Sequence, residues 1–259
     1  MKNLKVSVLI ANYNNQNYVN ECIRSVKKQT YKNIEIIFHD DFSSDDSIKY
    51  AKKFKNIKII KNKNRTDIGS FNQIKAYQRA FNKSTGKIIF LLDSDDFFSA
   101  SKVENIVKMF LKNKKLTSIF DLPILKFKNK TIYKKNKTKL IKNFWPYIPP
   151  QSCITMRRKD FKKIINKINF QFFPDIWMDF RIALYLNHVS KNFFILNKNL
   201  TYYRQTAQMI SSNFTLLSRP WWKRRMQAHK YVKYFFSKQK VIYSKNLDYF
   251  LTLIINILI

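Results

Sequence analysis

The chain has 259 residues, of which 45% are hydrophobic and 16% aromatic, which suits one large α/β domain or two closely joined halves and excludes a disordered chain. Fifty Lys and Arg against 16 Asp and Glu give a formal net charge of +34, which attracts polyanions such as nucleic acid, anionic lipid or nucleotides. The many Lys, Asn and Ile and the two Gly are also what an AT-rich genome produces. The charge is therefore weak support for nucleic-acid binding, and no nucleic-acid-binding motif accompanies it.

The sequence has neither a disulfide scaffold nor a zinc pattern. Cys22 and Cys153 have no metal-like spacing, and we expect both in the core of a protein from a reducing compartment. The three His residues are scattered, which argues against a zinc site. The apolar run at 5–11 is followed at once by polar residues, so no signal peptide is visible. No stretch reaches the roughly 20 apolar residues of a membrane span.

Apolar periodicity predicts alternating strands and helices in the first half of the chain. Short apolar runs predict strands at 6–11, 34–39, 57–60 and 88–92, and helical spacing predicts helices at 18–29, 47–54 and 71–82. This β-α-β-α-β-α-β order indicates an α/β fold with a twisted, mainly parallel sheet.

After about residue 115 the pattern changes. Strand-like pieces at 118–125 and 130–133 lie in Lys- and Asn-rich surroundings, and a Pro-rich loop follows at 145–150 because Pro cannot donate to a strand ladder. We expect a helix at 176–189 and an extended segment at 196–204. The remaining C-terminal residues are basic, aromatic and mostly helical in pattern.

Three carboxylates, Asp93, Asp95 and Asp96, directly follow the apolar run at 88–92. Repulsion makes three acids at one strand end costly unless a cation or ligand compensates. Ligand sites of open α/β sheets lie at such strand ends, and Mg²⁺ and Mn²⁺ share oxygen ligands with substrate phosphates. The motif therefore favours a metal–diphosphate site over the alternative, a solvated turn that caps the next helix.

Polar or acidic residues also follow two other predicted strands, at 12–14 and at 40–41. In a parallel sheet these ends share one edge. Here the chain resembles the family 2 glycosyltransferases, inverting enzymes with the GT-A fold. Residues 6–14 look like their opening strand, and 25–37 look like the segment S-x-x-x-Q-T-Y-x-x-x-E-I-I. Asp93-Ser94-Asp95 matches the family's Asp-x-Asp motif.

The resemblance extends more weakly to about residue 213, through 178–181, 200–204 and 210–212. The chain departs from the family's pattern at three positions. Phe42 replaces a turn glycine, so we expect the loop backbone to differ there. Met178 stands where Glu is common. Thr206 stands near a position that is often His, which removes a contact to the diphosphate or metal.

The resemblance implies a Rossmann-like GT-A fold, with a mainly parallel twisted sheet, helices on both faces and a basic helical C-terminal tail. Residues 1–115 would form the nucleotide-sugar-binding half, 116–215 the acceptor-binding and catalytic-base half, and 216–259 the tail. It assigns nucleotide-sugar binding to Ala11, Tyr13, Asp40, Asp41, Asp93 and Ser94.

Within this set, Tyr13 would stack on or border the base, and Asp40 and Asp41 would accept hydrogen bonds from base and ribose. The alternatives are that Tyr13 is a core residue and that the two acids cap the next helix, a role open to Ser43 and Ser44 instead.

Asp95 is the expected ligand of Mn²⁺ or Mg²⁺, with Asp93 and Asp96 as further candidates, and Asp96 could instead cap the following helix. Growing negative charge on the departing phosphate calls for such a Lewis acid. An inverting displacement also needs one base beside the acceptor hydroxyl. Asp179 is the candidate and Asp175 the runner-up, although Asp179 could be a solvated helix acid and Asp175 an N-cap. Lys75 and Arg65 could offer charge to the diphosphate.

The expected donor is a nucleotide-diphosphate sugar, with UDP first and dTDP or GDP as alternatives. The acceptor would be a glycan or a lipid-linked sugar, and the aromatic segment 145–152 could border it. The tail from Arg219 combines aromatic and basic residues, which suit an anionic membrane surface; the alternative is a helix packed back on the domain. We expect a cytoplasmic enzyme, peripheral on the inner face of the membrane, in surface polysaccharide synthesis.

Two other functions compete with this one. A basic nucleic-acid-binding protein would leave the acids at the strand ends as bystanders that repel phosphate. A nucleotidyltransferase also uses paired acids and a metal, but it usually has a Gly-rich phosphate loop near the first strand. This chain has only Gly69 and Gly86, which counts against that function.

Overall fold

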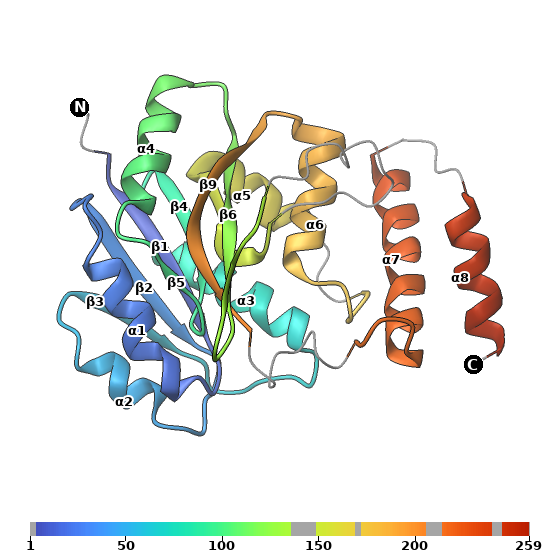
Figure 1. Cartoon of the computed structure of the whole chain (residues 1–259), viewed down its shortest axis with the longest axis horizontal. Helices are drawn as coiled ribbons and strands as arrows, with labels where there is room; N and C mark the ends of the chain where they lie inside the picture. Colours follow the sequence, from blue (N-terminus) through green and yellow to red (C-terminus); the bar gives the residue numbers. More distant parts are fainter. Residues whose placement is uncertain (1–3, 136–148, 169–171, 206–213, 240–244, 259) are drawn as a thin grey trace.

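The computed structural model describes residues 4–135, 149–168, 172–205, 214–239 and 245–258. Its first half alternates strands and helices as the apolar periodicity predicts (Figure 1). The strands are β1 (Val6–Asn12), β2 (Ile34–Asp40), β3 (Ile57–Lys61) and β4 (Ile88–Asp93), and the helices between them are α1 (Gln16–Lys27), α2 (Ser47–Lys52) and α3 (Gly69–Asn82). The end of each element lies within two residues of its prediction.

The second half is less regular. It contains β5 (Phe97–Phe98), α4 (Lys102–Lys112), β6 (Ser118–Lys126), β7 (Thr131–Tyr133), the 3-10 helix η2 (Gln151–Cys153), β8 (Ile154–Arg157), α5 (Arg158–Lys167), α6 (Met178–Tyr185), its π-helical continuation η3 (Leu186–Ser190) and β9 (Phe193–Arg204). The predicted strands, the helix at 176–189 and the extended segment are confirmed. The elements β5, η2, β8 and α5 were not predicted, and α4 was expected only as a helix following the acids, without bounds. Most of the Pro-rich loop, 145–148, lies outside the described residues.

One sheet runs through both halves, with strand order β3-β2-β1-β4-β8-β6-β9-β5, and β7 pairs with β6. The first four strands are parallel, as predicted. β8 enters antiparallel between β4 and β6, and β6 and β9 pair in parallel. The sheet is therefore continuous across residue 115, where the sequence pattern changes.

Helices cover both faces of the sheet, as expected for this α/β class (Figure 1). Successive side chains of a strand point to opposite faces, and β1 shows this directly. Val8 and Ile10 belong to a core shared with α1 and α4, whereas Leu9 belongs to a second core shared with α3, α5 and α6. Both cysteines are buried and free, in agreement with the core positions expected for them.

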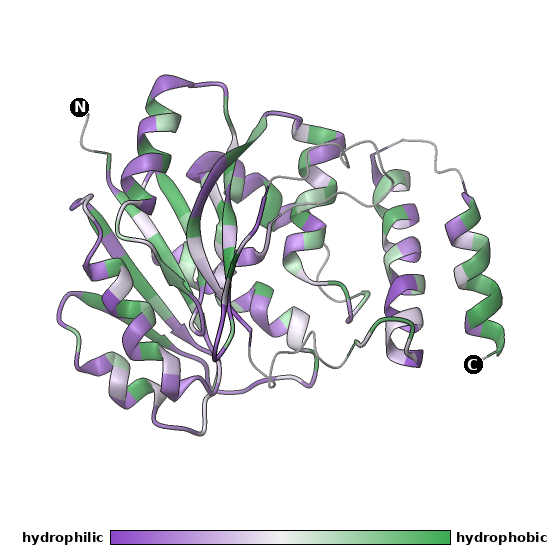
Figure 2. Ribbon diagram, in the orientation of Figure 1, coloured by the Kyte–Doolittle hydropathy of each residue, from purple (hydrophilic) through white to green (hydrophobic). Residues whose placement is uncertain are grey.

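The tail forms two helices, α7 (Arg219–Lys238) and α8 (Leu247–Leu258). α7 packs on the domain, because Tyr231, Val232 and Phe235 are buried in the second core. α8 lies beside α7 (Figure 1), where Asp248 pairs with Arg225. Most of α8 is coloured as hydrophobic in Figure 2, although no helix in the described ranges is long and apolar enough to cross a membrane.

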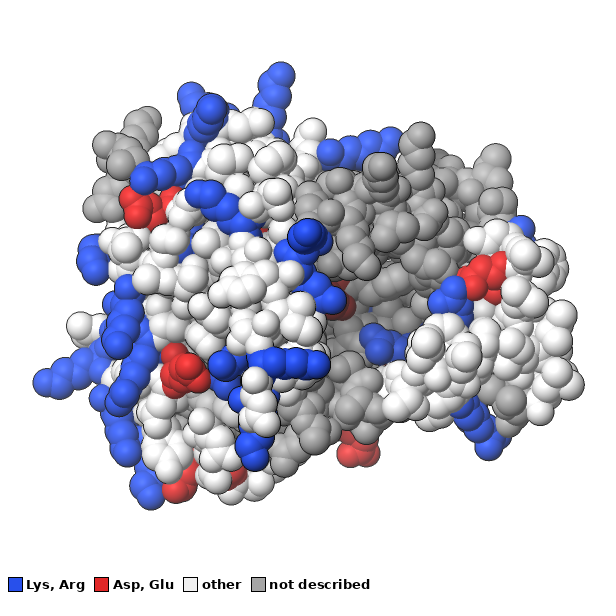
Figure 3. All heavy atoms as spheres, in the orientation of Figure 1, with Lys and Arg blue, Asp and Glu red and all other residues white. Residues whose placement is uncertain are grey.

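On the face that Figure 3 shows, basic side chains are scattered among uncharged residues, with few acidic ones, and the coloured residues do not form one stripe. A single basic face or stripe is the usual footprint of a nucleic-acid-binding protein. This face therefore does not show that footprint.

Candidate active site

The polar ends of three parallel strands meet at one edge of the sheet. Ala11 on β1 lies beside His39 on β2 and beside Asp93 at the end of β4, and Asn12 lies beside Asp40. The register thus brings the predicted residues of β1, β2 and β4 together. Ala11 contributes through its backbone, because its carbonyl accepts a 3.0 Å hydrogen bond from the N–H of Ser94.

Asp93 is held from two sides. The Tyr77 hydroxyl donates to its Oδ1 at 2.8 Å and Gln73 donates to the same oxygen at 3.2 Å, while Ser152 accepts from its backbone N–H at 3.0 Å. Burial and the charge of Asp95 raise the pKa of Asp93 to about 7, despite these hydrogen bonds. Gln73 and Tyr77 were missed from the sequence, although their spacing of four puts both on one face of α3.

Asp96 is engaged through both carboxylate oxygens. Its Oδ2 accepts from the Ser152 hydroxyl at 2.6 Å, and its Oδ1 accepts from the backbone N–H of Arg204 at 2.9 Å. Burial and the charges of the neighbouring acids raise its pKa. Asp96 therefore ties η2 and the end of β9 to the acidic loop. It does not cap α4, which begins after Ser101.

A buried ion pair holds Ser152 in place. Lys102 and Asp121 are both fully buried, with 2.8 Å between Nζ and Oδ1. Lys102 also donates to the carbonyl oxygen of Ser152 and to Thr201 Oγ1, each at 2.6 Å. These bonds fix Ser152, the residue that contacts both Asp93 and Asp96. The pairing of a lysine on α4 with an aspartate on β6 was not anticipated from the sequence.

Asp95 differs from its two neighbours. Arg204 donates to its backbone carbonyl at 2.7 Å, but in the described ranges no side chain donates to its carboxylate. Burial raises its pKa. A desolvated carboxylate beside two others suits a hard divalent cation. No group of three or more His, Cys, Asp and Glu in the described residues is arranged to hold a metal ion.

The acids after β2 have distinct environments. Asp40 is fully buried and accepts from Asn12 at 2.7 Å and from the backbone N–H of Ser43 at 3.0 Å, so it fixes the loop. Asp41 accepts from Asn62 and from Arg65 Nε, both at 2.9 Å. Asp41 thus holds Arg65 at the edge where the strands end.

Tyr13 lies at the rim of this edge and is 39% exposed, so it is not a core residue. The Arg65 guanidinium stacks over its ring, 3.4 Å from Cζ to the ring centroid. Tyr13, Arg65 and Asp41 therefore form a continuous row. Lys75, the other candidate cation, donates to Gln78 on its own helix at 3.4 Å.

Two residues shape the loops around this row. Phe42 has a φ of 64°, so it adopts the left-handed conformation that glycine accepts at little cost. The turn keeps this conformation without glycine. Ser94 is fully buried and accepts from Asn15 at 2.9 Å, so its side chain orders the acidic loop.

Asp179 and Asp175 lie near the start of α6. Half-buried Asp179 is in the first turn of the helix and accepts from the N–H of Phe180 at 2.7 Å. Burial raises the pKa of Asp179, and the charge of Arg224 partly opposes that rise. The charge of Asp179 in turn helps to raise the pKa of Asp93. Asp175 instead accepts from Gln227 at 2.7 Å. Of the two, Asp179 is the one coupled to the acid cluster. Thr206 and 210–212 lie outside the described residues.

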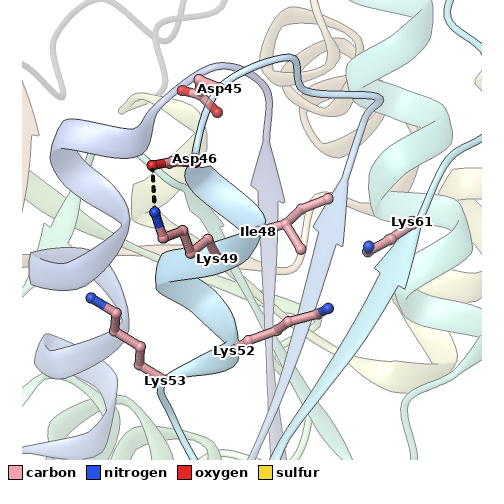
Figure 4. A pocket seen from close by; sticks show the side chains of 7 residues that line it. All are labelled: Asp45, Asp46, Ile48, Lys49, Lys52, Lys53 and Lys61. Atoms are coloured by element: carbon pink, nitrogen blue, oxygen red, sulfur yellow. Dashed lines mark hydrogen bonds and ion pairs between the residues drawn. The ribbon is translucent and has the colours of Figure 1, made fainter.

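The structure also has a surface pocket of about 580 Å³ (Figure 4). It is lined by Asp45, Asp46, Ile48, Lys49, Lys52, Lys53 and Lys61. Asp46 pairs with Lys49 at 3.2 Å on the surface of α2. None of the lining residues belongs to the predicted site, and all four lysines are exposed. The pocket therefore marks a basic outer surface at α2 and β3.

Comparisons with known proteins agree with the family resemblance seen in the sequence. The family model "Glycosyl transferase family 2" matches residues 7–172. An uncharacterised glycosyltransferase of Nostoc sp. (strain PCC 7120 / SAG 25.82 / UTEX 2576) is 30% identical over 78% of this chain and 65% of its own length. The Escherichia coli UDP-Glc:alpha-D-GlcNAc-diphosphoundecaprenol beta-1,3-glucosyltransferase WfaP is 31% identical over 80% of each chain.

Solved structures share the fold at low sequence identity. S. aureus TarS 1–349 in complex with UDP-GlcNAc superposes with a TM-score of 0.65 at 16% identity, covering 88% of this chain and 66% of that one. The mannosyltransferase PcManGT of Pyrobaculum calidifontis, in complex with GDP-Man and Mn²⁺, gives 0.60 at 12% identity, covering 95% and 67%. The GT-A likeness thus extends beyond the residues that the family model matches.

Proposed function

Because the chain belongs to glycosyl transferase family 2, we propose that it is an inverting glycosyltransferase. It moves a sugar from a nucleotide-diphosphate donor to a hydroxyl of a glycan or lipid-linked acceptor in surface polysaccharide synthesis. The observation that carries this proposal is the convergence of the acids that end β2 and β4 at one edge of the sheet, with Asp179 on α6 near enough to Asp93 for its charge to raise the pKa of that carboxyl. This arrangement supports a site that combines donor and acceptor chemistry.

The donor is proposed to be a UDP-sugar, with dTDP or GDP as alternatives. The name of the similar E. coli enzyme specifies UDP-Glc, and TarS was crystallised with UDP-GlcNAc. In this chain the row of Tyr13, Arg65 and Asp41 offers an aromatic face and a carboxylate acceptor for the base and ribose. Ala11, Asp93 and Ser94 would complete this donor-binding half, within 1–115.

The reaction needs charge stabilisation on one side of the sugar and a base on the other. Mn²⁺ or Mg²⁺, held by Asp95 with Asp93, would supply Lewis-acid stabilisation of the departing diphosphate. Asp96 would hold the loop through Ser152 and Arg204. Asp179 would accept the proton of the acceptor hydroxyl, so that a single displacement inverts the anomeric carbon. Residues 116–215 would then form the acceptor-binding half.

The acceptor is proposed to be lipid-linked, with the enzyme peripheral on the inner face of the membrane. The name of the similar E. coli enzyme includes a diphosphoundecaprenol acceptor. In this chain α8 exposes apolar side chains, with Leu251 48%, Ile254 53% and Leu258 77% exposed. An exposed apolar helix face on a basic protein suits the interface of an anionic bilayer.

A nucleotide panel tests the function. Melting temperature should rise with UDP, dTDP or GDP, and the rise should depend on Mn²⁺. Asp95→Asn should lose most of this metal dependence and reduce turnover of the nucleotide sugar by orders of magnitude, while its own melting temperature without ligand stays near that of wild type. Equal turnover in chelator and in Mn²⁺ would disprove the metal role. Stabilisation by oligonucleotides alone would favour a nucleic-acid-binding protein.

A further inference from the structure

One of the two glycines of the chain makes room for a tryptophan ring. At Gly69, the first residue of α3, a Cβ atom would lie 3.2 Å from Cη2 of Trp177. Gly69 does not have a positive φ, so its backbone conformation does not call for glycine. What glycine provides at this position is the space that the edge of the indole occupies.

The contact with Trp177 lies on the face of α3 that reaches the acid cluster. Residues four apart share a helix face, and Gly69, Gln73 and Tyr77 follow one another at this spacing. Gln73 and Tyr77 donate to Oδ1 of Asp93 at 3.2 and 2.8 Å. A rise of about 1.5 Å per residue puts Gly69 about 6 Å along the helix axis from Gln73. The indole therefore contacts α3 about one turn from a residue that holds Asp93.

Trp177 also stands directly before α6, two residues ahead of Asp179. The segment in front of α6 is fixed to α3, because the Ser70 hydroxyl donates to the carbonyl oxygen of Pro174. The carbonyl oxygen of Trp177 accepts from the N–H of Arg181 at 3.3 Å, within the first turn of α6. The backbone of Trp177 is thus held between α3 and the helix that carries the proposed base.

The indole of Trp177 has binding groups that the fold does not use. It is half-buried, and within the residues that the structure describes its ring pairs with no aromatic or cationic side chain and its N–H donates to no acceptor. Trp221 and Trp222, in contrast, pack against each other with 4.7 Å between ring centroids. A tryptophan combines a broad apolar ring with one donor that usually has a partner when buried. Trp177 therefore offers a ring and a donor to a ligand beside Asp179.

We propose that Trp177 binds the pyranose ring of the acceptor sugar, and that Gly69 positions the indole for this contact. The inference rests on the proposed function. A pyranose presents C–H groups on its faces and hydroxyls around its edge, which match the indole ring and its N–H. In an inverting displacement the acceptor hydroxyl approaches on the side of the base, away from the departing diphosphate. The acceptor subsite then lies where the starts of α3 and α6 meet.

Calorimetric binding of an acceptor probe tests the assignment in the full chain. The probe is α-D-GlcNAc diphosphate carrying a short prenyl chain, the class of acceptor in the name of the similar E. coli enzyme. With UDP and Mn²⁺ present, Trp177→Leu should raise the Kd of the probe about tenfold, because the contact with the ring is lost. The Kd of UDP-glucose, measured without the probe, should change by less than about twofold.

Tyr50→Leu is the matched control. It removes a half-buried aromatic ring from α2, in the other core, and should leave both affinities unchanged. Trp177→Phe keeps a smaller ring without the N–H, so its Kd for the probe should fall between those of wild type and Trp177→Leu while it melts near the wild-type temperature.

Gly69→Ala tests the position of the ring without removing it. The added methyl group requires the indole to move by a few tenths of an ångström, so the Kd of the probe should rise about threefold. Alanine favours a helix more than glycine, so the melting temperature should stay the same or rise. In Trp177→Phe, whose shorter ring leaves room for the methyl group, Gly69→Ala should cost little further affinity.

Three results would count against these assignments. Wild-type affinity for the probe in Trp177→Leu would overturn the inference, and so would equal weakening of the probe and of UDP-glucose. A loss from Gly69→Ala that is as large in Trp177→Phe as in wild type would remove the positioning role of Gly69. A wild-type chain that binds no nucleoside diphosphate would instead refute the proposed function itself.

Discussion

Glu35 on β2 accepts a 2.8 Å hydrogen bond from the backbone N–H of Gly86, which joins the second strand to the entry of β4. The same carboxylate accepts from Ser7 at 2.5 Å and from Thr85 Oγ1 at 3.0 Å. At Gly86 a Cβ atom would lie 2.5 Å from the backbone nitrogen of Ser7. Glycine is therefore needed at position 86 because the backbone segments of Gly86 and Ser7 approach closely, and not because of an unusual φ.

The Glu35 contacts predict an acid-sensitive contribution to stability. Burial alone would raise the pKa of Glu35, but hydrogen bonds from Ser7, Thr85 and Gly86 lower it from 4.5 to about 2. The stabilisation should be complete above about pH 4.5 and should be lost as pH falls toward 2. Glu35→Gln should therefore lower the melting temperature at pH 7 by more than it does near pH 3.

Asp67→Asn, at an exposed position, is the control and should change the melting temperature little at either pH. An equal loss at both pH values for Glu35→Gln would show that the ionised carboxylate is not what stabilises this junction.

Asp179→Asn should slow acceptor transfer by orders of magnitude while donor binding stays. The substitution keeps size and polarity but removes basicity, and loss of a general base typically costs about 10²–10⁴ in rate. Asp175→Asn is the comparison, and it should cost much less because Asp175 already pairs with Gln227. Transfer rates and nucleotide affinities of both variants are the measurements. The reverse order would identify Asp175 as the base, and full transfer by both would exclude each of them.

Substitution of Asp41 should affect nucleotide binding, whereas substitution of Asp40 should affect the stability of the fold. Asp41→Asn is expected to weaken UDP binding about tenfold with a small change in melting temperature, because Asp41 sits in the row with Tyr13 and Arg65. Asp40→Asn should instead lower the melting temperature, since its carboxylate is fully buried and fixes the loop at Asn12 and Ser43. Wild-type affinity in Asp41→Asn would remove this residue from the donor site.

Replacing Phe42 by glycine should stabilise the fold. A non-glycine residue at φ 64° destabilises the folded state by roughly 1–2 kcal/mol. Glycine removes this strain, but its greater conformational entropy in the unfolded chain offsets about half of the gain. Phe42 is 56% exposed, so little packing is lost, and the melting temperature should rise by about 2 °C. Phe172→Gly, at a comparably exposed position without positive φ, should lower it. A lower melting temperature for Phe42→Gly would mean that its ring contributes more than its backbone costs.

The apolar face of α8 should provide membrane binding that survives high salt. At 1 M salt the Debye length is about 3 Å, so attraction between a basic protein and anionic vesicles is screened. Ile254→Glu should remove the vesicle binding that remains, whereas Tyr133→Glu, at an exposed position of β7, should not. Equal retention by both variants would exclude α8 as the membrane contact. Truncation before Arg219 is a poorer test, since α7 contributes Tyr231 and Phe235 to the core.

The first half of the fold was predictable because each strand is a short buried apolar run and each helix has apolar residues at the spacing of a helical turn. Position in the sheet was predictable only where neighbours in sequence are neighbours in space. β8 has four residues, one of them the buried Thr155, and its place between β4 and β6 depends on strands far along the chain. Local pattern therefore gave no signal for it.

The site was predictable to a similar depth. Strand ends of a parallel sheet must meet, so Asp40, Asp41 and Asp93 were expected together. Which oxygen is already engaged was not predictable, because Tyr77, Ser152 and Arg204 come from separate elements. Tyr77 has an ordinary place on a buried helix face, and only the packed structure shows that its hydroxyl reaches Asp93.

The insertion of β8 beside β4 has a consequence for synthesis of the chain on the ribosome. Until Ile154–Arg157 has emerged, β4 is an unprotected edge strand beside β1, and such edges invite pairing with other chains. The nascent first half thus has to wait for residues about sixty positions downstream, and pairings over such separations form slowly. Translation pauses before residue 154 should favour aggregation, whereas pauses after β9 is complete should be harmless.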